Sequence, residues 1–247
     1  MARLVPLLLC LSLLSCSRIG LTEAEDLYQQ ALIQEAQCLV LLCTGDLEAS
    51  DDLFDASFSD LQEVRLATEI EPPIPREIIF IPPWVPGALV LTHEGSAAQA
   101  IDEGRYTAWD SLNSLFAIER IEPAKFSQPG ESTNHLYSRE ILHPQRMCES
   151  YLELPEVLHA NPQQQVYIDG LCEQPNLYPF HRDGYRSYLF HNCRGNCRTA
   201  CLEDEFWYFR FVGNDLQLLE YWDTEASPEE PTWWPEAEQN YNRYYYP

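Results

Sequence analysis

The 247-residue sequence predicts an α+β protein with two folded units: a ferredoxin-like βαββαβ module over residues 83–168, followed by a Cys-rich antiparallel β unit over residues 169–223. Two observations lead to this prediction. In the first unit, short apolar strands and capped helices follow one another in the order strand, helix, strand, strand, helix, strand. In the second unit, strand-like runs rich in aromatic residues are joined by a hairpin turn. A hydrophobic share of 45% is typical of a globular chain.

Residues 1–16 have the pattern of an export signal. Arg3 supplies the positive charge, and the apolar run 4–14 is shorter than the about 20 residues that span a bilayer. Small residues around Cys16 fit a conventional cleavage site, but Leu13-Leu14-Ser15-Cys16 also resembles a lipobox, in which Cys16 would be lipidated. We therefore expect an exported chain, either released outside the cytoplasm or lipid-anchored at the cell envelope.

The chain is strongly acidic. It has 15 Lys and Arg against 39 Asp and Glu, a formal net charge of −24. Nucleic-acid-binding proteins present basic surfaces to the phosphate backbone, and anionic membrane surfaces likewise attract basic segments. We expect no nucleic-acid partner, and membrane contact only through a lipid anchor at Cys16.

Three segments outside the two units differ in composition. Residues 22–43 are predicted to form a helix, because Thr22 and Glu25 make a capping box ahead of a loose apolar face. The acidic and Pro-rich stretch 44–82 is predicted to be a linker. Residues 224–247, rich in Pro, Glu, Trp and Tyr, are predicted to form a mobile tail.

Within the first unit several elements have their own signals, although the alternation at 117–122 and 135–142 is poor and the order of the elements carries the prediction. Pro86-Gly87 precedes an apolar strand, Ser96 begins a capped helix, and Pro144 suits the first position of the second helix. The strands are predicted at 88–91, 117–122, 135–142 and 157–161.

The second unit is predicted to contain strands at 185–191, 206–212 and 216–222, the last two joined by the turn Gly213-Asn214-Asp215. Outside the leader, seven cysteines are candidates for disulfides, as an exported location favours: Cys38, Cys43, Cys148, Cys172, Cys193, Cys197 and Cys201. Seven is odd, so at least one is free or pairs with another chain, and the pairing stays open.

Few patterns point to catalysis or to a metal. His191 with Cys193, Cys197 and Cys201 could ligate zinc, although a disulfide-stapled loop that uses Cys172 or Cys148 is favoured. The acids 203–205 could serve sugar hydrolysis, but we interpret them as a charged loop entering a hairpin. No Gly-rich phosphate loop or EF-hand loop occurs. We expect a non-enzymatic chain with no cofactor.

The first unit resembles the N-terminal propeptide of secreted subtilisin-type proteases. The likeness rests on Pro86-Gly87-Ala88-Leu89-Val90 at its start and on the run 154–162, Leu-Pro-Glu-Val-Leu-His-Ala-Asn-Pro, at its end. The resemblance implies a ferredoxin-like module whose segment after the last strand lies in a protease cleft as a pseudo-substrate. That segment is here Asn161, Pro162, Gln163, Gln164 and Gln165. The family has an acid where Asn161 stands, and no catalytic triad motif follows.

The leading functional hypothesis is therefore an exported protein-binding module, an inhibitor of subtilisin-type proteases, whose partner is a secreted protease or another extracytoplasmic protein. The alternative is an envelope-associated lipoprotein or interaction module that shares only the fold with propeptides. A Cys-rich metal-dependent enzyme is the third hypothesis.

Overall fold

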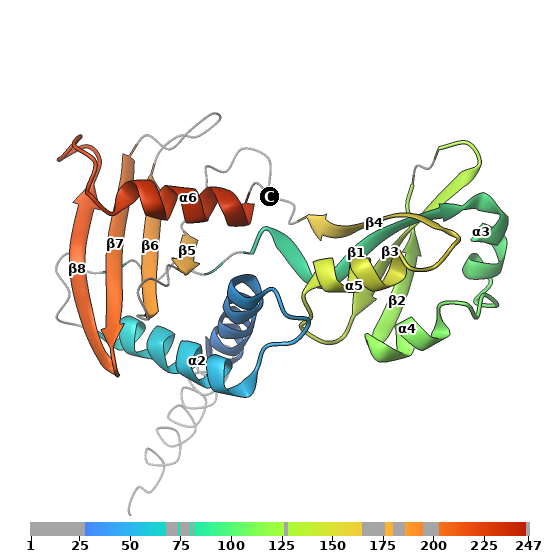
Figure 1. Ribbon diagram of the computed structural model, residues 1–247, viewed down its shortest axis with the longest axis horizontal. Coiled ribbons are helices and arrows are strands. Elements are labelled where there is room, and N and C mark those ends of the chain that lie inside the picture. Colours follow the sequence, from blue (N-terminus) through green and yellow to red (C-terminus); the bar gives the residue numbers. More distant parts are fainter. Residues whose placement is uncertain are drawn as a thin grey trace, which may run out of the picture.

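The computed structural model describes residues 28–67, 74, 80, 82–125, 128–164, 176–179, 186–194 and 203–245. Over these residues the protein is of the mixed α+β class, with two four-stranded antiparallel sheets. Figure 1 shows the sheets at opposite ends of the long axis. The export signal 1–16, including Cys16, lies outside the described residues.

The first sheet has the strand order β2-β3-β1-β4, and every neighbouring pair is antiparallel. Its strands are β1 (Trp84–Glu94), β2 (Ile118–Pro123), β3 (Glu131–Ser138) and β4 (Val157–Gln164). β3 begins and ends earlier than predicted, because the chain leaves the sheet after Ser138 and Ile141 packs against the core of the second sheet.

Three short helices accompany this sheet: α3 (Gly95–Asp102), α4 (Asp110–Leu115) and α5 (Pro144–Tyr151). Pro144 is at the start of α5, as predicted, where a missing N–H costs nothing. Met147, Cys148 and Tyr151 of α5 are fully buried against Leu89 and Leu136 of the sheet. This core lies on one face of the sheet only.

The second sheet has the order β5-β6-β7-β8, with β5 (Asn176–Pro179), β6 (Arg186–Arg194), β7 (Glu203–Val212) and β8 (Asp215–Asp223). Val212 pairs with Asp215, so the predicted hairpin turn is the two-residue loop Gly213-Asn214, with Gly213 at φ +65°. The alternation of side chains along β6 and β7 sends alternate aromatic residues into separate cores on the two faces.

Helices cover both faces of the second sheet (Figure 1). On one face lie the first helix, described over 28–44, and α2 (Asp51–Leu66). On the other lies α6 (Trp234–Tyr245). The described part of the first helix confirms that prediction, while the capping pair Thr22 and Glu25 lies outside the described residues.

Two predictions were wrong here. The predicted linker 44–82 contains α2, whose residues Ser57, Asp60, Leu61 and Val64 are buried at helical spacing against the second sheet. The predicted mobile tail 224–247 contains α6, which begins beside the buried Trp233 and packs through Ala237. In both segments, burial of a few large apolar side chains outweighs the polar composition that suggested a loose chain.

The two sheets are joined by reciprocal packing. Leu47, from the loop after the first helix, packs in the core of the first sheet, and Trp84 of β1 packs in the core of the second. Arg146 Nε donates to the Gly45 carbonyl oxygen at 2.6 Å, and the His143 amide donates to that of Leu47 at 2.9 Å. The described part of the module, residues 83–164, is therefore not packed independently of the N-terminal helices.

Candidate functional site

The pseudo-substrate residues lie inside a strand. Asn161, Pro162, Gln163 and Gln164 form the second half of β4, and Gln165 lies outside the described residues. Asn161 pairs with Val90 and Pro162 with Leu89. The expectation that this segment extends freely after the last strand is thus wrong for its described part, because β1 is long enough to pair with it.

β4 is the outermost strand of the first sheet, and no described strand pairs with its outer edge. Proline is tolerated in an edge strand when the position of its missing N–H faces away from the neighbouring strand. Successive residues alternate in direction, so this condition on Pro162 places the backbone groups of Ala160 on the same outer edge. The alternation is interrupted at Leu158, which the pairing with β1 skips between His159 and Val157. That edge can therefore donate and accept hydrogen bonds from an added strand.

The edge lacks the charges that usually block strand addition. β4 contains no Asp, Glu, Lys or Arg, although the chain as a whole has a net charge of −24. The edge strand β2 carries Glu119, Arg120 and Glu122 in six residues, and β8 carries Asp215, Glu220 and Asp223 in nine. β5, the remaining edge, is only four residues long. Natural edge strands are protected by such charges, by short length, by proline or by a β-bulge, and β4 carries Pro162 and an irregularity at Leu158 in place of charges.

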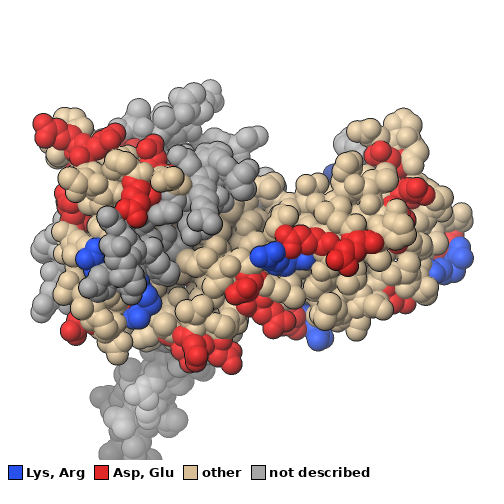
Figure 2. All heavy atoms as spheres, in the orientation of Figure 1, with Lys and Arg blue, Asp and Glu red and all other residues tan. Residues whose placement is uncertain are grey.

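The surface charge over β4 also differs from that of its surroundings. Figure 2 shows that the surface over β4 carries little charge, while acidic side chains lie beside it over α5. Leu158 of β4 is also one of the exposed large hydrophobic residues, with 38% of its surface accessible. The β4 edge is therefore uncharged and partly apolar.

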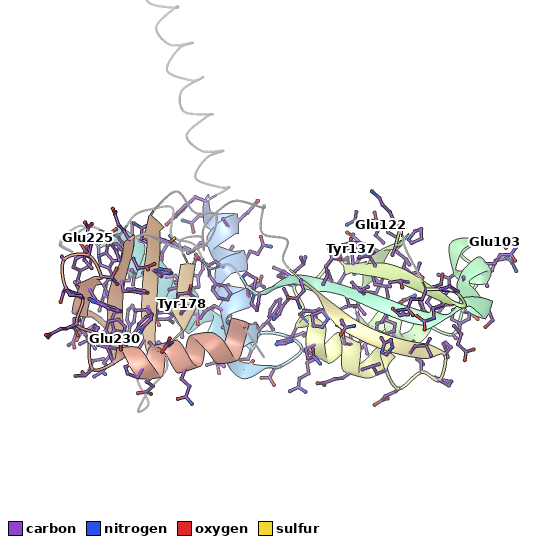
Figure 3. The ribbon with its side chains drawn as sticks, turned by 90° about the horizontal axis from the view of Figure 1, so that it is seen from above. Glu103, Glu122, Tyr137, Tyr178, Glu225 and Glu230 are labelled. Atoms are coloured by element: carbon purple, nitrogen blue, oxygen red, sulfur yellow. The ribbon has the colours of Figure 1, made fainter. Side chains whose placement is uncertain are left out.

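The open face of the first sheet, opposite α5, is polar. The Arg120 guanidinium lies 3.9 Å from the centre of the Tyr137 ring and donates from a terminal nitrogen to Glu122 at 3.0 Å. His135 is stacked with Tyr137, their ring centres 6.5 Å apart, and its Nδ1 lies 3.3 Å from Gln163 Oε1. Tyr137 and Glu122 are labelled in Figure 3 on the side of the sheet away from α5. This face adjoins the β4 edge and offers hydrogen-bonding and stacking groups to a partner.

The other face contains a buried polar cluster. His93 is fully buried, with Nε2 2.7 Å from Asn134 Oδ1 and Nδ1 3.0 Å from the Glu94 carbonyl oxygen. Nearby, the Trp109 indole N–H donates to Glu156 at 3.1 Å. Burial acts to raise the pKa of Glu156, but hydrogen bonds, first among them one from Tyr106, outweigh it and the pKa is lowered. These contacts join the buried polar side chains to one another at the end of the core.

Three of the candidate disulfide cysteines are free thiols: Cys38, Cys43 and Cys148. Cys38 and Cys43 are five residues apart on one helix, so their rise along the axis, about 7.5 Å, exceeds the Cα separation that a disulfide allows. Cys148 lies in the other core. The disulfide prediction is corrected for these residues.

The remaining candidate cysteines are Cys172, Cys193, Cys197 and Cys201, of which Cys193 lies near the end of β6. Cys193 is disulfide-bonded, whereas Cys172, Cys197 and Cys201 lie outside the described residues. The zinc hypothesis also needed His191, but its Nε2 lies 2.7 Å from Asp204 Oδ1 and its Nδ1 lies 3.5 Å from the Tyr178 hydroxyl. In the described part of the chain no group of three or more potential ligands is placed to hold a metal ion.

Two of the acids 203–205, Asp204 and Glu205, make hydrogen bonds within the second sheet. Asp204 contacts His191, and Glu205 accepts hydrogen bonds from Asn192 at 2.7 Å and from the Tyr221 hydroxyl at 2.8 Å. The Phe206 ring is stacked on His191, with ring centres 4.5 Å apart, and is buried in the core under α6. These contacts agree with the interpretation of a charged segment that enters an aromatic hairpin.

Comparison with protein-family models, with curated proteins and with solved structures found no match to this chain. Among the described helices, none has both the length and the apolar character needed to cross a membrane.

Two features of the site were missed at the sequence level. The first is the open face of His135, Tyr137 and Arg120, for which the alternation of His135 and Tyr137 along one strand was an available signal. The second is the edge position of β4 with its exposed Leu158. Only the sheet order shows this position.

Proposed function

We propose that this chain is an exported, non-enzymatic protein-binding protein that accepts a strand of its partner on the outer edge of β4. The partner class that we propose is a secreted protease of the subtilisin type. The observation that carries the proposal is that β4 is an eight-residue edge strand without a charged residue, and that it includes Asn161 to Gln164.

The arrangement of the first sheet supports a propeptide-like module. A βαββαβ chain with the order β2-β3-β1-β4 and antiparallel neighbours is the arrangement expected of the ferredoxin-like fold, to which we assign residues 83–168. The likeness to propeptides at Pro86-Gly87 and at the run 154–162 agrees with this assignment.

In binding by strand addition, backbone hydrogen bonds supply affinity and side-chain contacts supply selectivity. The outward N–H and C=O groups of Ala160 supply affinity that depends little on sequence. Side chains on the open face, such as His159, Asn161 and Gln163, supply selectivity. Because the segment is held in the sheet, the partner would meet a preorganised edge and little entropy is lost on binding.

The test is inhibition of subtilisin by the whole purified chain, with a chromogenic peptide as substrate. The Ala160→Pro variant removes the outward N–H and should weaken inhibition at least tenfold, whereas Ala160→Ser keeps that N–H and should inhibit as the unchanged chain does. Full substrate turnover at a large excess of the unchanged chain would refute the protease as partner.

The reciprocal packing of Leu47 and Trp84 favours a second candidate, an envelope-associated interaction module that shares only its fold with propeptides. A propeptide acts as a separable unit, whereas here residues 84–164 are packed against the N-terminal helices. Metabolic labelling with palmitate tests the anchor that this candidate requires. Label that is incorporated by the unchanged chain and lost in Cys16→Ala would support it, and equal labelling of both would refute it.

A further inference from the structure

His143 lies where the two sheets meet. It is the residue before Pro144 of α5, and its backbone amide donates across the junction to the Leu47 carbonyl oxygen at 2.9 Å. Its imidazole ring lies 5.0 Å from the Trp84 ring, centre to centre, and Trp84 packs in the core of the second sheet. We propose that this junction is sensitive to pH: a proton added to the His143 imidazole loosens the packing between residues 83–164 and the N-terminal helices.

The surroundings of the His143 ring fit a neutral imidazole. Its Nδ1 atom is buried and has no hydrogen-bond partner among the described residues. The neighbouring ring from β1, that of Trp84, carries no charge. A neutral imidazole leaves one nitrogen without a hydrogen atom, whereas both nitrogens of the imidazolium ion are donors. Protonation would therefore bury a charged N–H group without a partner, and opening the junction relieves this cost because water then reaches the ring.

The charged groups that act on the ring come from two elements. Arg146 of α5 repels a protonated ring, whereas Glu149 of the same helix and Asp46 of the loop after the first helix attract it, as does the residue's own carbonyl group. Arg146 is held in place, because it donates to the Gly45 carbonyl oxygen at 2.6 Å and to Glu149 at 2.8 Å. Burial, followed by the charge of Arg146, lowers the pKa of His143 below its ordinary value of 6.5.

The direction of the pH effect follows from this lowered pKa. A histidine whose pKa is lower in the closed junction than in water binds its proton more tightly when the junction is open. The closed junction is therefore most stable above pH 6.5, and it loses stability as the pH falls from there toward the lowered pKa. A single proton changes the opening equilibrium by at most about tenfold per pH unit.

The opening can stay local because each sheet has its own core. Met147 and Tyr151 of α5 are fully buried in the core of the first sheet, whereas the first helix and α2 pack in the core of the second. Opening would expose Leu47 and Trp84 and would separate the module from the helices. A propeptide acts as a separable unit, so acid would supply that separability. This consequence rests on the proposed function, whereas the pH-sensitive junction does not.

The test is hydrogen exchange of the whole chain, followed by NMR from pH 7 to pH 5 with no protease present, so that its failure and the failure of protease inhibition are separate results. The His143 amide reports the junction, because its hydrogen bond to Leu47 breaks on opening. Its protection factor, corrected for the intrinsic pH dependence of exchange, should fall by about threefold to thirtyfold, the upper figure being the limit for one proton. The Leu136 amide, in the interior strand β3, should keep its protection.

Two variants identify the side chain that responds to pH. His143→Phe keeps a ring beside Trp84 but cannot bind a proton, so the protection of the amide at this position should not change with pH. His159→Phe is the matched control: His159 is exposed on β4, and this variant should respond like the unchanged chain. Equal pH responses of the two variants would overturn the proposal. Even if a variant does not fold, constant protection of the His143 amide in the unchanged chain, or an equal fall at Leu136, would overturn it as well.

Discussion

Asp60 of α2 and Arg186 of β6 form a bidentate ion pair, with Oδ2 2.6 Å from Nε and Oδ1 2.9 Å from a terminal guanidinium nitrogen. The Tyr188 hydroxyl donates to the same carboxylate at 2.8 Å. The pair joins residues 126 positions apart in the sequence. It ties a helix in the segment that we expected to be a linker to a central strand of the second sheet.

We expect Asp60→Asn to destabilise the fold by about 3 kcal/mol, because removing one partner leaves the other charge without compensation. This is the lower end of the range for buried pairs, since the Arg186 side chain is 33% exposed while that of Asp60 is 3% exposed. Urea unfolding measures the change. Asp55→Asn, at an exposed position of the same helix, should alter stability by less than about 0.5 kcal/mol. Equal effects of the two substitutions would contradict this role of the pair.

Gly87 should be irreplaceable for a local reason. It has φ +65°, and a Cβ added there would lie 2.5 Å from the Glu140 carbonyl oxygen. Gly104 has φ +64° but no atom within 4 Å of such a Cβ. We expect Gly104→Ala to cost about 1 kcal/mol from backbone strain alone, and Gly87→Ala to cost clearly more because a backbone oxygen must also move. Thermal unfolding measures the loss of stability in each variant. An equal loss in both would show that the Glu140 carbonyl oxygen moves away from the added Cβ at no cost in free energy.

The elements of the first sheet could be predicted because several have a local signal and their order is distinctive, although the alternation in β2 and β3 is poor. Pro86-Gly87 marks the bend in β1, where the pairing register with β4 shifts between Trp84 and Leu89. By contrast, α2 was missed because two of its four buried residues, Ser57 and Asp60, are polar, which hides its inner face. Asp60 is buried only because Arg186 compensates its charge. That is tertiary information, which no local pattern contains.

α6 was missed although the residues at its start are apolar, whereas the buried face of α2 is partly polar. Its Trp-rich start looked like a tail with nothing to cover, yet Trp233 packs on Tyr208 with ring centres 5.3 Å apart and donates from its indole N–H to Glu220 at 2.6 Å. The candidate site was predicted in part. The resemblance marked Asn161 to Gln164, but whether a strand is central or at an edge depends on the sheet order.

Glu35 should give the stability a distinct pH dependence. Its carboxylate accepts from the Phe80 amide at 2.5 Å and pairs with Arg65, but burial dominates and raises the pKa of Glu35. A carboxyl whose pKa is higher in the folded than in the unfolded state binds its proton more tightly when folded. It therefore adds stability below its unfolded pKa, and that stability is lost as the pH rises through the folded pKa.

The measurement is urea unfolding of the unchanged chain and of Glu35→Gln from pH 7 down toward the unfolded pKa, near 4.5. Subtracting the free energy of unfolding of Glu35→Gln from that of the unchanged chain removes the contribution of the other acids. The unchanged chain should gain stability relative to Glu35→Gln as the pH falls. A constant difference would show that the interactions with Arg65 and Phe80 balance burial, and a difference of the opposite sign would show that they outweigh it.

The thiol state of the buried cysteines gives the last prediction. Burial raises the pKa of Cys38, Cys43 and Cys148 to about 12. At pH 8 only about one in 10⁴ of such thiols is the reactive thiolate, so iodoacetamide should not label them in the folded chain. In urea without reductant all three should be labelled, and peptide mass spectrometry identifies each site. Labelling of Cys38 or Cys148 that requires prior reduction would instead mean that these residues form disulfides, and that their cores pack differently from the arrangement described above.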